Sequence, residues 1–194
     1  MYIPRHFEVT DKREILAFIA ANAFGQLVSR VGGRLFSTHL PFLLDERGST
    51  LLAHVAKQNP QHQEIHGQEA LVTFQGPHAY ISPSWYEGPG VPTWNYQAVH
   101  VYGRCEVFDD STRLAKLVAA LTGKYEQGFT EPWFPQYPQG MLGAIVGIEI
   151  TIDELQCKYK LSQNRPAGDR QQVIRKLGGG ESEALAEAMR RNEA

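Results

Sequence analysis

The sequence has no long apolar run and no excess of charge of either sign. No apolar stretch reaches the roughly 18 residues that a membrane-spanning helix needs, and residues 1–14 lack the apolar segment of a secretory signal. The formal net charge is −2, which does not support direct binding to the phosphates of DNA over a wide face. We therefore expect a cytoplasmic protein that does not contact a membrane.

Cysteine and the common catalytic motifs are also scarce. Two cysteines, Cys105 and Cys157, cannot form a disulfide framework and are typical of buried thiols in a reducing compartment. The sequence contains no GxGxxG after a strand, no GxxxxGK[ST], no CxxC and no GxSxG. These absences give no support to a Rossmann or P-loop nucleotide site, to a thiol redox motif or to a hydrolase elbow.

Histidine is present, but its spacing does not favour a metal site. His62 and His66 lie four residues apart, so one helical face can present both. Neither belongs to an HExxH motif, and the surrounding segment is polar. A solvated pair is favoured over a metal site, and we expect no metal.

The hydrophobic pattern predicts a mainly β protein with peripheral helices. Strands are predicted over residues 24–31, 34–44, 50–55, 69–76, 78–83, 94–108, 145–152 and 157–161. Gly32 and Gly33 tolerate positive φ and predict a tight hairpin turn. Short strands at close spacing favour an antiparallel barrel or sandwich.

Helices are predicted at four places in the chain, one of them a short helix to which the polar loop of residues 57–67 leads. The first covers about residues 11–21, with Asp11 and Glu14 spaced as a capping box. Another is capped by Asp109, Asp110 or Ser111 and carries its apolar stripe on four residues, Leu114, Leu117, Val118 and Leu121. The tail from residue 166 is charged, predicted helical and solvated, and split by glycines 178–180. We expect one domain over residues 1–165 and a helical tail over 166–194.

The segment STHLPF, residues 37–42, places polar side chains in a strand otherwise made of Leu and Phe. Pro41 cannot donate to a sheet ladder, so this part of the strand is predicted to be an edge or a bulge. Either position opens a barrel to a ligand, and Ser37, Thr38, His39 and Leu40 become candidate site residues. The alternative is an edge strand protected against aggregation.

The segment AHVAKQNPQ, residues 53–61, ends a strand and releases Lys57 and Asn59 into a loop. An amine, an amide and free backbone N–H groups are what a phosphate monoester binds. His54, near the end of that strand, is either a packing residue or part of the site. The alternative for Lys57 is an ordinary solvated loop lysine.

Aromatic residues gather around a Pro/Gly loop over residues 83–93, in YISPSWY before it and VPTWNY after it. Flat side chains beside hydroxyl and amide groups can line a pocket for a planar heteroaromatic ligand. Trp94 and Asn95 are the candidates from this stretch. An aromatic cluster that pins the loop is the alternative.

Six segments in order resemble the PaiB-type FMN-binding regulators: MYIPRHFE, STHLPF, AHVAKQNPQ, GPHAYISPSWY, VPTWNYQAVHVYG and KLSQNR. The resemblance extends from Met1 to about Gly178. It implies an FMN-binding split barrel with Greek-key-like strand order, like that of the pyridoxamine-phosphate oxidase superfamily. It also implies a homodimer with flavin at the subunit interface, and a role as a negative transcriptional regulator.

The resemblance and the chemistry together suggest a role for each candidate. Lys57 and Asn59 are the first candidates for the FMN phosphate, and His54 lies beside the phosphate or the ribityl chain. Lys160 and Arg165 are the second phosphate candidates, reaching across the dimer. The flavin ring is expected to contact the edge strand and the aromatic loop, through Ser37, Thr38, His39, Leu40, Trp94 and Asn95.

Two other functions remain open at this point. The first is a flavin-dependent oxidoreductase that takes electrons from a nicotinamide donor and passes them to an unknown acceptor. The second is haem binding or degradation, for which His39, His54, His62 and His66 are available. The sequence identifies no catalytic residue.

Overall fold

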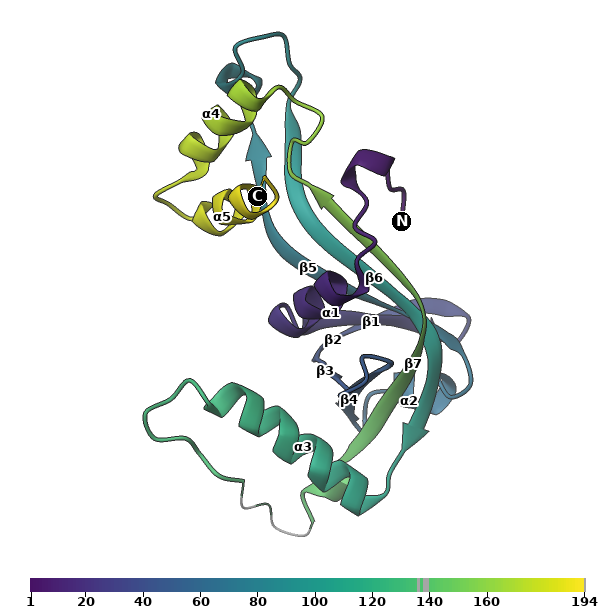
Figure 1. The fold of residues 1–194 in the computed structure, drawn as a ribbon. Coiled ribbons are helices and arrows are strands. Elements are labelled where there is room, and N and C mark those ends of the chain that lie inside the picture. The colour runs from purple at the N-terminus through teal and green to yellow at the C-terminus, as the bar shows by residue number, and fades with distance from the viewer. Residues whose placement is uncertain (136, 138–139, 194) are drawn as a thin grey trace. The chain divides into compact units, whose positions relative to one another are not determined.

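The computed structural model describes residues 1–135, 137 and 140–193. The helices are α1 (Lys12–Ala21), α2 (Gln61–Glu64), α3 (Ser111–Glu126), α4 (Ala167–Leu177) and α5 (Glu183–Arg191) (Figure 1). The strands are β1 (Phe24–Val31), β2 (Arg34–Pro41), β3 (Leu43–Leu44), β4 (Thr50–Ala56), β5 (Glu69–Ile81), β6 (Thr93–Phe108) and β7 (Ile145–Lys160). Short 3-10 turns lie at Arg5–Phe7, Pro83–Trp85 and Leu142–Ala144.

The seven strands form one sheet in the order β2-β1-β5-β6-β7-β4-β3. The β1–β2, β1–β5, β3–β4 and β4–β7 pairs are antiparallel. Strand β2 stands at one end of this order and lies beside β4, near the other end. The sheet therefore curls into a barrel, and β2 is an edge strand, as predicted.

Two strands are longer than the sequence pattern predicts. Residues 69–76 and 78–83 were expected as separate strands, but β5 runs unbroken to Ile81. Gly76 is needed there for close packing and not for a turn, because a Cβ would lie 2.7 Å from the Phe18 ring. Strand β7 likewise continues through residues 153–156, three of which are polar and all of which lie exposed or half-exposed on it.

The β1–β2 hairpin is the one that the glycines predict. Gly32 and Gly33 have φ of 57° and 76°, and Val31 pairs with Arg34. Two consecutive positive φ values match a two-residue turn whose twist suits the flanking strands. The turn is also tied to α2, because the Gly32 amide donates to the two carboxylate oxygens of Glu64 at 2.9 and 3.1 Å.

An aspartate carboxylate caps the N-terminus of each of the helices α1 and α3. Asp11 Oδ1 accepts from the amide of Arg13 at 2.8 Å, and Asp110 Oδ1 accepts from the amide of Arg113 at 2.8 Å. Each cap satisfies an amide that has no partner inside its helix. On α3 the buried residues are Leu114, Leu117 and Leu121.

The chain forms two compact units, and β5, β6 and β7 contribute residues to both. Unit 2 comprises Ile19–Phe74 and His100–Leu155. Its apolar interior includes Leu27, Phe42, Leu51, Val72, Phe74, Ile148 and Ile150, each at most 1 % exposed. Among the described residues, no helix is both long and apolar enough to cross a membrane.

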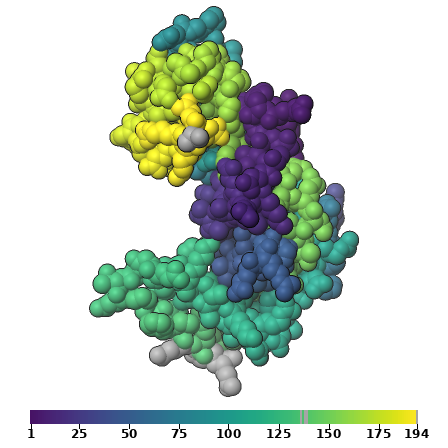
Figure 2. Space-filling model, in the orientation of Figure 1, coloured from purple at the N-terminus to yellow at the C-terminus, as the bar shows by residue number. Residues whose placement is uncertain are grey.

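Unit 1 comprises Met1–Phe18, Gln75–Val99 and the chain from Gln156 onward. Its helices α4 and α5 pack together (Figure 2) and bury apolar side chains: Val173, Ile174, Leu177, Leu185, Ala186, Ala188 and Met189. The expectation of a solvated tail is therefore wrong, because the tail carries its own apolar stripe. The division of the chain at residue 165 stays a prediction, since burial does not measure independent folding.

We expect Gly103→Ala to lower the free energy of unfolding by about 2 kcal/mol. A Cβ on Gly103 would overlap the backbone oxygen of Thr151, and a strand backbone cannot move as a flexible side chain can. Gly123→Ala is the matched control, because nothing lies within 4 Å of its Cβ position. On helix α3 that change should raise stability by about 0.5–1 kcal/mol. Equal effects of both changes in urea unfolding would contradict the argument.

Candidate flavin-binding site

A cluster of polar side chains in unit 2 joins the edge strand β2 to the loop before α2. Asn59 Nδ2 donates to Thr38 Oγ1 at 3.0 Å, and Thr38 Oγ1 donates to Gln61 Oε1 at 2.7 Å. Asn59 Oδ1 accepts from the Gln61 amide at 2.9 Å. Thr38 and Asn59 were predicted from separate segments of the chain, and the structure brings them into contact.

Gln61 is the central residue of this cluster and is fully buried. Its Nε2 donates to the Leu27 carbonyl at 3.2 Å and to Ser29 Oγ at 2.9 Å, both on β1. The amide therefore ties the loop to two strands at once. Gln61 was not among the residues predicted from the sequence. The only sequence feature that marks it is its position directly after Asn59-Pro60.

Lys57 stands where β4 ends, with its main chain fixed and its side chain exposed. Its amide donates to the Ala144 carbonyl at 2.9 Å, and its carbonyl oxygen lies 3.0 Å from His62 Nε2. Among the described residues, the Lys57 amine has no hydrogen-bond or ion-pair partner. A rigid backbone with a free cation is a suitable arrangement for an anionic ligand.

His62 and His66 have different partners. His62 lies against the Lys57 carbonyl, whereas His66 Nδ1 accepts from the Val107 amide at 3.2 Å. The structure therefore does not use the two as a ligand pair. Within the described part of the chain, no three His, Cys, Asp or Glu side chains are grouped as metal ligands.

The side chains of the four candidate residues on β2 do not all point to the same face of the strand. Ser37 and His39 are exposed, Thr38 is half-buried, and Leu40 is 7 % exposed. Side chains on a strand alternate between its faces, so Leu40 packs in the core and offers a ligand only its backbone. His39 stacks against Phe24, with ring centroids 6.2 Å apart.

His54 lies on β4 opposite Gly147. Its Nδ1 is buried and has no hydrogen-bond partner among the described residues. Burial lowers the pKa of His54 below its ordinary value of 6.5, because a charged imidazole loses hydration there. His54 is therefore a neutral, partly unsatisfied side chain in the structure.

The remaining three candidates belong to unit 1. Trp94 is 54 % exposed, and its ring lies 6.2 Å from that of Tyr80. Asn95, the next residue, points to the opposite face and is buried, with Nδ2 donating to Ser162 Oγ at 2.8 Å. Lys160 Nζ donates to Thr93 Oγ1 and to the Trp94 carbonyl, both at 2.7 Å. Asn95 thus secures β6 to the chain after β7, while Trp94 and Lys160 stay partly accessible.

Residues 1–154 match a family model described as "Putative FMN-binding domain". Over 185 residues the chain is also 40 % identical to "Protease synthase and sporulation protein PAI 2" of Bacillus subtilis, covering 91 % of this chain and 89 % of the relative. The chain belongs to this family. The resemblance to PaiB-type proteins is thereby confirmed, and the family match assigns FMN to the domain as its cofactor.

More distant proteins share sequence or fold with the chain. An uncharacterized protein of Emericella nidulans is 34 % identical over 80 % of this chain and 82 % of its own. Among solved structures, the flavocytochrome Anf3 of Azotobacter vinelandii has a TM-score of 0.66 at 19 % identity, covering 81 % of this chain and 72 % of that one. An FAD and haem binding protein of Mycobacterium smegmatis has a TM-score of 0.66 at 17 % identity, covering 89 % and 80 %. These likenesses confirm the predicted split-barrel fold.

The residues in unit 2 fit an FMN phosphate in charge and in donor chemistry. Lys57 supplies a cation that has no counter-ion among the residues the structure describes, and the Thr38–Asn59–Gln61 cluster holds the loop that carries it. FMN supplies reversible one- and two-electron transfer when it is bound. The side chains described here can bind and orient it.

We expect Thr38→Val to destabilise the protein by about 1–3 kcal/mol, because it leaves buried Gln61 Oε1 and the Asn59 amide without a partner. The substitution keeps the shape of the side chain. Ser37→Ala, at the exposed neighbouring position, should change the free energy of unfolding by less than about 0.5 kcal/mol. Urea denaturation of both variants tests this, and a neutral Thr38→Val would show that the cluster is not stabilising.

His54 makes stability depend on pH. Because the folded pKa lies below 6.5, the unfolded chain binds more protons as the pH falls through 6.5. As far as His54 is concerned, the free energy of unfolding should be highest above pH 6.5. It should decline as the pH falls below 6.5 and become constant again below the pKa of His54 in the folded protein. His100, whose pKa burial also lowers, acts in the same window. Melting temperatures from pH 8 to pH 5 should fall less steeply for His54→Gln, and an unchanged slope would contradict this role.

Proposed function

We propose that the chain binds FMN with its phosphate at Lys57 and Asn59 and its ring along the edge strand β2. One observation carries the proposal. The hydrogen bond between Asn59 and Thr38 places the loop beside the strand, so a single ligand can contact both. The backbone of Ser37 to Leu40 offers hydrogen-bonding groups to the edge of a flavin ring, because β2 is a terminal strand of the sheet. His54 is proposed to lie beside the phosphate or the ribityl chain.

The candidates in unit 1 are proposed as a second set of flavin contacts in a cytoplasmic homodimer. Trp94 offers an exposed aromatic face, and Lys160 offers a cation. Asn95 acts by fixing β6, since its Nδ2 already donates to Ser162. The resemblance to proteins that hold flavin at a subunit interface supports this arrangement.

For the biological role we propose a flavin-binding regulator of the PaiB type. The B. subtilis relative is named for protease synthesis and sporulation, which supports a regulatory role. A net charge of −2 favours an indirect effect on gene expression over reading of an operator by this chain alone. Flavin-dependent electron transfer from a nicotinamide donor is the alternative. Anaerobic addition of NADPH separates the two, because bleaching of the bound flavin favours the oxidoreductase.

FMN retention is the first measurement. The purified protein is mixed with FMN, freed of excess ligand and examined by visible absorption. A retained flavin spectrum is expected. Lys57→Met should raise the FMN dissociation constant about tenfold, because it removes a charge-assisted hydrogen bond to the phosphate. Lys116→Met, an exposed lysine on α3, is the control with unchanged affinity.

Riboflavin, which has no phosphate, sharpens the same experiment. Its affinity should be the same for the wild type and for Lys57→Met. If the substitution weakens riboflavin and FMN equally, Lys57 does not contact the phosphate. If the wild type retains no flavin at any concentration, the proposed site is wrong.

A further inference from the structure

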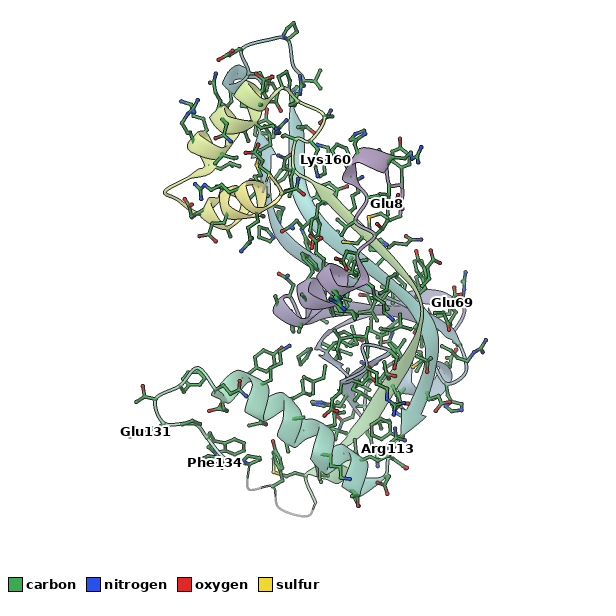
Figure 3. All side chains as sticks on the ribbon, in the orientation of Figure 1. Glu8, Glu69, Arg113, Glu131, Phe134 and Lys160 are labelled. Atoms are coloured by element: carbon green, nitrogen blue, oxygen red, sulfur yellow. The ribbon has the colours of Figure 1, made fainter. Side chains whose placement is uncertain are left out.

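A cavity in unit 2 lies between the C-terminal half of α3 and the segment that follows the helix. Its volume is about 480 Å³, which is within the range of small-molecule pockets in proteins. One wall is formed by α3 from Ala119 onward, and the other by residues 132–135. Figure 3 labels Glu131 and Phe134 on this segment. All lining residues belong to unit 2, and none is a candidate for the flavin site.

Side-chain contacts fix the segment against the helix. The Trp133 amide donates to Glu126 Oε2 at 2.7 Å, and the hydroxyl oxygens of Thr122 and Tyr137 lie 3.1 Å apart. The rings of Trp133 and Tyr137 meet edge to face, with centroids 5.9 Å apart. The cavity is therefore bounded by groups that have defined partners on both walls.

The walls of the cavity are mostly apolar and aromatic. The rings of Trp133 and Phe134 line it, together with Pro132, Pro135 and Ala119. Trp133 is 53 % exposed and Phe134 is 76 % exposed, so neither ring is used up in the core. Open aromatic faces bind apolar groups, and their quadrupole also attracts cations.

The polar side of the cavity is negative. Half-buried Glu126 and its neighbour Gln127 lie at the C-terminal end of α3, where the helix dipole adds partial negative charge. Among the described residues, no Lys, Arg or His lines the cavity or lies within 4.0 Å of the Glu126 carboxylate. The Trp133 amide uses one of roughly four lone-pair sites of that carboxylate, so acceptor capacity remains for a ligand.

The lysine nearest in sequence does not supply the counter-charge. Lys124 Nζ donates to the Ala20 carbonyl at 2.9 Å and lies 5.6 Å from the Tyr125 ring centroid. Residues two apart on a helix do not face each other, so this amine points away from Glu126. Glu131 likewise forms no ion pair within the part of the chain that the structure describes. Negative charge beside the rings is thus left without a cation from the chain.

We propose that this cavity binds a small organic cation, with an ammonium group attached to an apolar or aromatic body. The ammonium group lies between the Glu126 carboxylate and the face of Trp133, where both attract positive charge. The apolar body packs against Phe134 and the two prolines. An anionic ligand would be repelled by the carboxylate. The site stands without the flavin proposal, because the two share no residue.

Titration calorimetry of the full-length protein with benzyltrimethylammonium chloride tests the site. Sodium chloride keeps the ionic strength constant, and N-benzylacetamide serves as an uncharged ligand of similar size. The wild type should bind the cation more tightly than the amide. Glu126→Gln should weaken cation binding about three- to tenfold and leave N-benzylacetamide unchanged, because the new side chain can still accept from the Trp133 amide.

Three further variants separate charge from shape. Glu46→Gln removes an equal charge from an exposed turn of unit 2 and should bind both ligands as the wild type does. Trp133→Leu should weaken both, because the ring is also an apolar wall. Ala119→Phe should block both by filling the cavity from an exposed position of α3, without touching the hydrogen bond of Glu126. Melting temperatures check the folding of each variant.

Three results would overturn the proposal. Equal affinity of the wild type for the two ligands, or unchanged cation affinity in Glu126→Gln, would show that the charge is not recognised. A wild type that binds neither ligand at tens of millimolar would show that the cavity is not a ligand site. Weaker self-association of Phe134→Ser in sedimentation would then assign the exposed rings to a second copy of the chain. If Glu126→Gln unfolds, Ala119→Phe decides, and binding that survives this change contradicts the site.

Discussion

The side-chain amide of Gln61 is the interaction on which the candidate flavin site depends. Its oxygen and nitrogen together bind Thr38 on β2 and both Leu27 and Ser29 on β1. A buried amide with no partner is costly, so the loop carrying Lys57 and Asn59 has one favourable position. Helix α2 has only four residues and could not hold that position through its own stability. The Glu64 contact with the hairpin turn fixes the other end of the helix.

Local signals in the sequence predicted local structure well. Gly32-Gly33 predicted the hairpin and Asp11 predicted the cap of α1, because each depends on a few adjacent residues. For α3 the sequence left three adjacent cap residues open, and the structure shows Asp110 in that position. The continuity of β5 was missed because Gly76 is read from sequence as a turn, and only the packed Phe18 ring reveals its purpose. The burial of α4 and α5 was missed because their charged residues were weighed above their apolar stripe.

The candidate site was predictable in composition but not in geometry. Thr38 and Asn59 lie in different motifs, 21 residues apart in the sequence, and proved to be in contact. Strand alternation nevertheless sends Leu40 inward and Ser37 outward. Asn95 and Trp94 divide in the same way. A motif names residue types, whereas the strand on which it lies decides which of those side chains can reach a ligand.

The edge strand β2 has a further consequence, for self-association. It has a hydrogen-bonded neighbour on one side only, and the exposed apolar residues Leu35 and Phe24, at 74 % and 65 %, lie on it and on the adjoining β1. Exposed edges of this kind recruit other strands and promote aggregation. Arg34 at one end of β2 and Pro41 at the other discourage such pairing. The unguarded stretch lies between them, so a flavin bound along Ser37 to His39, as proposed above, would also cover this edge and limit aggregation.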